Sequence, residues 1–169
     1  MRSGGLKERF PVWEIAKINL RHNSLLSVAM AAALCALTPL FIGTANLDRE
    51  ASAVPLEMFV SLTGLILLTP VFGPEQDEEI SDLVSSKYVS PFQVYRVRVL
   101  YSAAAACALI GLFAVYMGLR GCGVTLLLAL GTMADALFLG GMGMLGSALW
   151  GNTVIGYMPP LLYYALNIG

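Results

Sequence analysis

The sequence predicts an all-α integral membrane protein, a polytopic bundle of about five transmembrane helices. Of its 169 residues, 57% are hydrophobic and 12% are charged, whereas soluble domains carry about 25% charged residues. The mean hydropathy is +0.74, and one core of this size cannot hide so much apolar surface from water. The ten basic and eleven acidic residues lie mostly outside the long apolar runs. Because these charges nearly cancel, we expect no attraction of nucleic acid.

Four apolar runs approach or reach the roughly 17–25 residues that a membrane-spanning helix needs. They are residues 24–42, 56–72, 99–119 and 124–150. A fifth and shorter run, 153–168, carries Pro159-Pro160 near its middle. We expect the prolines to kink this span, with neighbouring helices satisfying the freed carbonyls.

The chain therefore divides into an N-terminal segment, 1–23, and a transmembrane domain, 24–169, in which residues 73–98 connect the second and third spans. Basic residues are concentrated on one side of these spans. Eight of them precede the first span or lie between the second and third: Arg2, Lys7, Arg9, Lys17, Arg21, Lys87, Arg96 and Arg98. The opposite side holds only Arg49 and Arg120. This bias places the N-terminus in the cytoplasm and, with five spans, the C-terminus outside.

Residues 10–22, FPVWEIAKINLRH, predict an amphipathic helix before the first span. Trp13 lies on its broad apolar face, while Glu14, Lys17 and Arg21 form a polar stripe. A basic amphipathic helix with a tryptophan should lie along the lipid headgroups. The alternative is a soluble helical lead-in.

Residues 73–92, GPEQDEEISDLVSSKYVSPF, predict a second amphipathic helix, on the cytoplasmic side. Its early acids, including Glu78 and Glu79, suit the positive end of a helix dipole, and Pro91 should stop the helix. A narrow ridge at helical spacing consists of Ile80, Leu83, Val84 and Lys87. The segment is either a solvated face or a docking surface for a cytoplasmic partner, and the sequence leaves both open.

The residues that catalysis or metal binding would need are missing, so we expect no enzymatic activity in this chain. His22 is the only histidine, which excludes a Ser-His-Asp set and a multi-histidine metal site. None of the three lysines lies in a phosphate-binding loop, so another polypeptide would have to bind any ATP used. The three cysteines form no paired motif and are expected to be apolar packing residues. Glu57, near the end of a span, is not expected to form a paired-carboxylate site.

Asp135 stands well inside the fourth span. A carboxylate at the bilayer centre costs about 2.5–3.5 kcal/mol on insertion scales, so it should face the bundle or a water-filled path, or be protonated. One interpretation places Asp135, with Thr132, on a substrate or proton path. The other is a polar contact that fixes helix packing, with Thr132 or with a hydroxyl on a neighbouring helix.

Small residues recur along one side of the same span at spacings of four and three. They are Ala136, Gly140, Gly143, Ser147 and Gly151. Such a face allows close helix approach in lipid. It could pack within the chain or form a dimer seam, and the sequence does not separate the two.

The order of parts resembles the membrane subunit of an ABC-2-type ABC transporter. The matching pattern is the helix FPVWEIAKINLRHN, two spans, the acidic segment GPEQDEEISDLVSSKYVSPFQVYRVRV, a third span and the glycine-rich LFLGGMGMLGSALWGNTVIGYMPPLLYY. The resemblance covers nearly the whole chain, but it rests on arrangement because this family has no sharp signature in its permease. Those permeases usually have six spans. We therefore expect a truncated or split permease, or a shorter relative that has lost transport.

The resemblance implies a permease subunit that moves a substrate, using ATP hydrolysed by a separate subunit. The expected direction of transport is export. ATP and Mg²⁺ would bind that partner and no cofactor this chain. The resemblance also implies that a second permease subunit is a partner of this chain. The chain is expected to lie in the lipid bilayer of a bacterial cell membrane. The implied contacts with the ATP-binding subunit are Trp13, Glu14, Lys17, Glu78, Glu79, Ile80, Leu83, Val84 and Lys87. The alternative is a non-transporting membrane protein that assembles with or anchors a partner.

Overall fold

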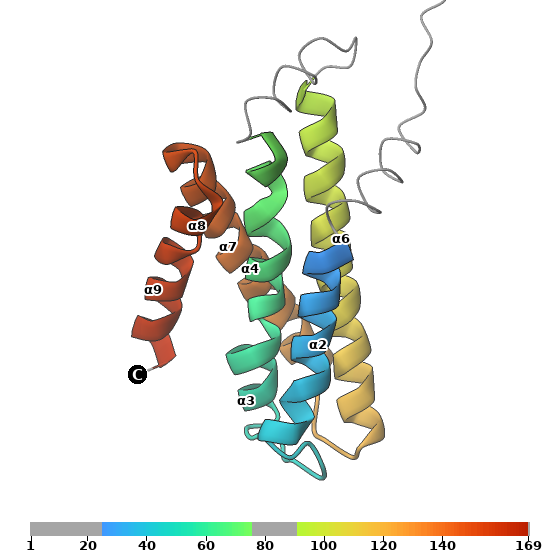
Figure 1. Ribbon diagram of the computed structural model, residues 1–169. Coiled ribbons are helices and arrows are strands. Elements are labelled where there is room, and N and C mark those ends of the chain that lie inside the picture. The colour runs from blue at the N-terminus through green and yellow to red at the C-terminus, as the bar shows by residue number, and fades with distance from the viewer. Residues whose placement is uncertain (1–24, 76–90, 169) are drawn as a thin grey trace, which may run out of the picture.

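The computed structural model describes residues 25–75 and 91–168, and within these ranges the chain is helical with no strand (Figure 1). The elements in chain order are α2 (Leu25–Phe41), α3 (Ala53–Pro55), η2 (Leu56–Val60), α4 (Leu62–Leu68), η3 (Thr69–Glu75), α6 (Pro91–Leu119), α7 (Leu126–Trp150), α8 (Thr153–Gly156) and α9 (Met158–Ile168). The amphipathic helix predicted over residues 10–22 lies outside the described residues. So does the ridge predicted for the acidic segment, within residues 76–90.

Three of these helical stretches are long and apolar enough to cross a membrane. They are Ala53–Gly73, Tyr95–Leu119 and Leu126–Trp150. The prediction of an all-α protein with transmembrane helices is thereby confirmed at this level. α2 is apolar but has 17 residues, or about 26 Å at 1.5 Å per residue, against a hydrocarbon core of about 30 Å. The count of five spans therefore stays a prediction.

The outward faces of the long helices carry the side chains expected next to lipid. Leu112 on α6 is 68% exposed, and Leu127 and Leu145 on α7 are 72% and 61% exposed. Soluble monomers rarely expose contiguous apolar surfaces of this kind. The bundle is therefore built to be surrounded by hydrocarbon.

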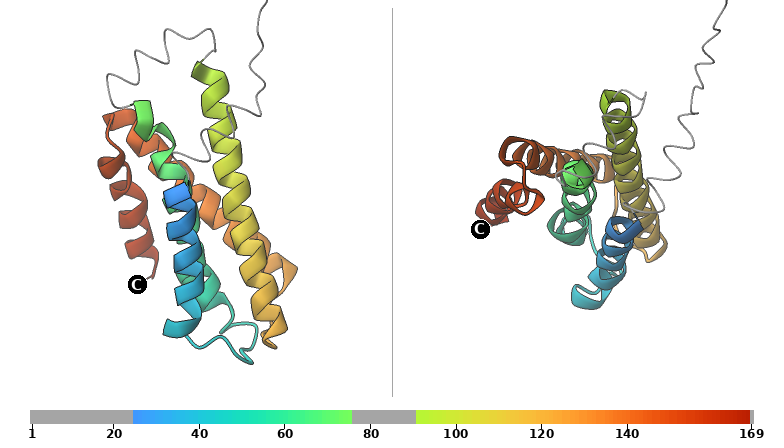
Figure 2. Two further views of the ribbon diagram at one scale, coloured as in Figure 1. Left: turned by 45° about the vertical axis from the view of Figure 1, so that its right-hand side comes forward. Right: turned by 45° about the horizontal axis from the view of Figure 1, so that its top comes forward.

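The helices run alternately up and down the bundle (Figures 1 and 2). α2 leads to a loop over residues 42–52, the α3–η3 stretch returns, α6 descends, and α7 returns again. We call the end that holds residues 42–52 and 120–125 the loop end. Its two loops are hydrogen-bonded to each other, because Asn46 N donates to Arg120 O at 3.2 Å and Gly123 N donates to Leu47 O at 2.8 Å.

α4 lies at the centre, in contact with α2, α6 and α7. Its approach to α7 is so close that a Cβ on Gly64 would overlap the backbone carbonyl of Ala136. A Cβ on Gly140 would lie 2.6 Å from Gly64 O, and one on Gly143 would overlap the Thr69 hydroxyl. The seam between α4 and α7 therefore depends on glycine. In lipid the hydrophobic effect does not draw helices together, so they associate through van der Waals contact, and glycine allows that contact to be close.

The small-residue face predicted on α7 is occupied within the chain. Four of its five members are buried: Ala136, Gly140, Gly143 and Ser147. They meet α4, η3 and α8, where a Cβ on Gly156 would lie 2.7 Å from the Ser147 Cβ. Gly151 has a different position, because it caps the C-terminal end of α7 with a left-handed φ of +60°.

Prolines set two element boundaries differently from the sequence prediction. α6 begins at Pro91 rather than near residue 99, since proline suits the first turn of a helix, where its missing N–H has no intrahelical acceptor. Arg96 and Arg98 are therefore helical and do not belong to a loop. Pro159 and Pro160 likewise lie in the first turn of α9. The predicted fifth span is thus divided into α8 and α9 by a break before the prolines, where a kink at mid-helix had been expected.

Candidate functional site

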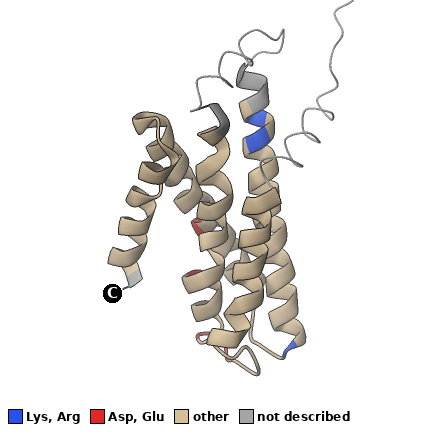
Figure 3. Ribbon diagram, viewed as in Figure 1, with Lys and Arg blue, Asp and Glu red and all other residues tan. Residues whose placement is uncertain are grey.

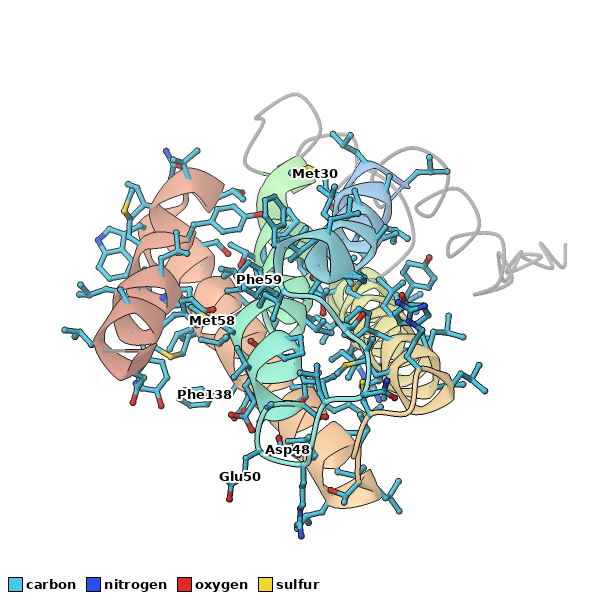
Figure 4. The ribbon with its side chains drawn as sticks, turned by 90° about the horizontal axis from the view of Figure 1, so that it is seen from below. Met30, Asp48, Glu50, Met58, Phe59 and Phe138 are labelled. Atoms are coloured by element: carbon cyan, nitrogen blue, oxygen red, sulfur yellow. The ribbon has the colours of Figure 1, made fainter. Side chains whose placement is uncertain are left out.

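A groove of about 430 Å³ opens between the α3–η2 stretch, α7 and α9. Its polar lining includes Glu57 and Ser61 from the first wall, Asp135 from α7, and Tyr164 and Asn167 from α9. In the view from the loop end, Met58 and Phe138 lie between the ribbons of η2, α7 and α9 (Figure 4); both line the groove. By residue count Glu57 is about 6 Å and Asp135 about 14 Å along their candidate spans from the loop end. The groove therefore extends into the apolar part of the bundle.

The first wall is an irregular turn of helix. Ser61 N donates to Leu56 O at 3.0 Å, the i→i−5 bond of a π-helix, and Pro55 just before it has no N–H to give. Such single π turns leave backbone carbonyls without their usual partners and are frequent at functional sites. Two carbonyls of this turn accept hydrogen bonds from side chains: the Ser61 hydroxyl donates to Glu57 O at 2.5 Å, and the Tyr164 hydroxyl donates to Met58 O.

α9 closes the other side of the groove through its aromatic residues. The rings of Tyr163 and Phe138 meet edge to face, with centroids 5.3 Å apart and an angle of 67° between planes. This is a favoured geometry for aromatic pairs. Asn167 Nδ2 donates to Tyr163 O at 3.1 Å, which leaves the amide oxygen and the second N–H of Nδ2 for other partners.

The charged side chains among the described residues that line the groove are all acidic. Glu57 and Asp135 bring two carboxyl groups, and none of the groove's described lining residues is basic. The four described basic residues are Arg49, Arg96, Arg98 and Arg120. In Figure 3 the basic positions lie toward the two ends of the bundle, whereas acidic positions also occur in its middle part. The described lining of the groove therefore supplies no positive charge to the two carboxyls.

The residues predicted for a substrate path separate in the structure. Asp135 is exposed toward the groove, while Thr132 is fully buried and its hydroxyl donates to Leu128 O at 3.0 Å. The same groove holds Glu57, which the sequence analysis did not connect with Asp135. It also holds three polar residues of the fifth apolar run, Tyr163, Tyr164 and Asn167, which the sequence analysis did not predict as site residues. The feature that could have indicated them is the spacing of Tyr163 and Asn167, which are four residues apart and therefore lie on one helix face.

Residues that could hold a metal ion are not gathered here. Within the described ranges, no three side chains of the His, Cys, Asp or Glu types come together. The Cys35, Cys107 and Cys122 thiols are free. The predicted contacts for an ATP-binding subunit, Trp13 to Lys17 and Glu78 to Lys87, lie outside the described residues.

Replacing Tyr164 by phenylalanine is expected to weaken the attachment of α9. The ring would remain, but the hydrogen bond from the phenol to Met58 O would be lost, and a net hydrogen bond contributes about 0.5–1.5 kcal/mol. We expect the apparent unfolding temperature in detergent micelles to fall by about 2–4 °C. Tyr163→Phe is the matched control, because its ring contact with Phe138 is retained and no backbone carbonyl depends on its hydroxyl. Equal shifts for the two variants would contradict the role of the Met58 contact.

Comparisons with protein-family models, with curated proteins and with solved structures found no match for this chain.

Proposed function

We propose that this chain is the membrane-spanning permease subunit of an ABC-2-type transporter. It would move its substrate by alternating exposure between packed helices, with ATP hydrolysed by a separate subunit. The observation that carries the proposal is the groove that holds Glu57 near the loop end and Asp135 deeper in the bundle. An ionisable residue as deep as Asp135 is expensive in a membrane, and such residues mark substrate or ion pathways by default.

The contacts between helices support a rigid part of the bundle, formed by α4 and α7, and a part that can move, formed by α9. α4 and α7 are joined backbone to backbone through Gly64 and Gly140, which leaves little room for sliding. α9 contacts only α7 and α8 extensively and bounds the groove, so its displacement would change access to the two carboxyls. We place the substrate path in this groove.

The drive for such a motion would come from the acidic segment. Residues 76–90 join the α4–η3 stretch directly to α6 in the sequence, so a force on this segment acts on two candidate spans. In the proposal the segment and the helix over residues 10–22 contact the ATP-binding subunit, which holds ATP and Mg²⁺. The N-terminus is cytoplasmic, five spans cross a bacterial cell membrane, and a second permease subunit completes the transporter.

The test is co-purification with an ATP-binding cassette subunit encoded beside this chain. The double substitution Leu83→Asp with Val84→Asp places charges on the apolar ridge, and we expect it to reduce the recovered ATPase about tenfold or more, a loss of at least about 1.4 kcal/mol of binding. Recovery would be measured by quantitative immunoblot after purification in dodecylmaltoside.

The matched control is Ser85→Asp with Ser86→Asp, which adds the same charge at positions that the predicted helix would place away from the ridge. Loss of the ATPase in both double variants would contradict the ridge as the docking surface. An ATPase that never associates with the unaltered chain would contradict the transporter and favour a membrane anchoring protein.

A further inference from the structure

We infer that the groove between η2, α7 and α9 binds an organic cation that carries N–H donors, such as a substituted ammonium or guanidinium group on an apolar body. As a substrate assignment this rests on the proposed function. As a binding site it stands on the geometry of the groove alone.

The first argument is the direction of the hydrogen bonds around the groove. The Ser61 hydroxyl donates to Glu57 O, the Tyr164 hydroxyl to Met58 O and the Asn167 amide to Tyr163 O. These three donors are used by backbone carbonyls, and the donors that remain are the second N–H of the Asn167 amide and the Tyr163 hydroxyl. The acceptors left for a ligand are lone pairs of the hydroxyls, an amide oxygen and the oxygens of two carboxyl groups. Because acceptors outnumber donors, the groove favours a ligand that donates, and it disfavours an anion.

The second argument is charge. Glu57 from η2 and Asp135 from α7 line one groove, and the described lining contains no basic side chain. Asp135 lies about 14 Å along its candidate span, and a carboxylate at that depth is expensive unless something pairs with it. A cation entering the groove supplies that pairing, and the low-dielectric surroundings that make an unpaired carboxylate unfavourable strengthen its binding.

The third argument is size and apolar lining, which separate an organic cation from a bare metal ion. A volume of about 430 Å³ falls within the range of pockets for drug-sized ligands. Val54, Met58 and Leu139 give the walls apolar surface, and the edge-to-face pair of Phe138 and Tyr163 offers aromatic faces. Aromatic faces attract cations through their quadrupole, whereas a metal ion would want a closer set of oxygen ligands.

The experiment uses the purified full chain in dodecylmaltoside micelles, which carry neither charge nor amine, and no ATPase partner. Ethidium is the cationic probe and 8-anilinonaphthalene-1-sulfonate is the anionic one, both followed by fluorescence. We expect ethidium to bind saturably and the anion not to displace it. The double variant Glu57→Gln with Asp135→Asn, which keeps the side-chain shapes, should lower ethidium affinity about tenfold or more.

The control is Glu50→Gln, which removes one charge from the exposed loop at the same end and should leave the affinity unchanged. Unfolding temperature is measured for every variant, so that a lost fold is distinguished from a lost site; if the double variant is unfolded, Phe138→Leu replaces it and should weaken ethidium severalfold. Equal affinity in the folded double variant and in Glu50→Gln would overturn the inference.

Phosphatidylethanolamine added to the micelles separates a free cation from a lipid headgroup, since both present an ammonium group. No displacement of ethidium supports the free cation. Displacement by phosphatidylethanolamine but not by phosphatidylglycerol would overturn the assignment and make an amine-bearing lipid the occupant. Because the assay contains no ATP-binding subunit, failed ATPase association leaves its result standing, and failed ethidium binding leaves the permease proposal open to its own test.

Discussion

Replacing Gly64 by alanine is expected to destabilise the bundle by about 3 kcal/mol, at the upper end of the usual cost of overpacking. The added Cβ would overlap the backbone carbonyl of Ala136 on α7. Both partners in this contact are backbone, so no side chain can rotate out of the way and the two helices must separate. The apparent unfolding temperature in detergent micelles should fall by about 6–12 °C.

Gly141→Ala is the control for this substitution. Gly141 lies on the same helix as the seam glycine Gly140, but a Cβ there would meet no heavy atom within 4 Å. Alanine in a helix interior is favoured over glycine by about 0.5–1 kcal/mol, so this variant should be unchanged or slightly more stable. If Gly64→Ala were as stable as Gly141→Ala, α4 and α7 could not be as close as described.

Replacing Asp135 by asparagine is expected to reduce transport about tenfold or more while the protein still assembles. The substitution keeps the side chain's shape but removes one of the two charges that face the groove, and a tenfold effect corresponds to about 1.4 kcal/mol. The measurement is ATP-dependent efflux of ethidium from cells that produce this chain together with its ATP-binding subunit. Co-purification of that subunit reports assembly in the same cells.

Thr132→Val serves as the comparison for Asp135→Asn. Its hydroxyl is buried and bonded to Leu128 O within the same helix, away from the groove, so its loss should leave efflux largely intact. Equal losses of efflux and of assembly in Asp135→Asn would show that the carboxyl only holds helices together.

The helices themselves could be predicted from the sequence. In a bilayer every backbone polar group must be satisfied within the chain, so an apolar run of spanning length has few choices besides a helix. The small residues of α7 were also readable, because Gly140 and Gly143 share a helix face. Their partners were not, since Gly64 belongs to a different run and only the packed bundle brings it to Ala136.

The groove was the part that sequence reasoning missed. Glu57 and Asp135 lie in different apolar runs, and nothing local to either residue indicates that they face one space. The π turn at η2 follows Pro55 and accepts a hydrogen bond from the Tyr164 hydroxyl, which reaches it from α9. Sequence reasoning did not foresee that helices begin at Pro91 and just before Pro159, for a related reason: a proline can either stop a helix or start one, and the neighbouring helices decide which.

The hydrogen bond from Tyr164 to Met58 makes the attachment of α9 to η2 sensitive to hydration of the groove. In hydrocarbon no water can take the place of the phenol hydroxyl, so breaking this hydrogen bond would cost several kcal/mol. Where water reaches it, the net contribution falls to about 1 kcal/mol, since water can replace the phenol. A dry groove therefore holds α9 firmly, and a hydrated one loosens it, so that solvent entry and helix release favour each other.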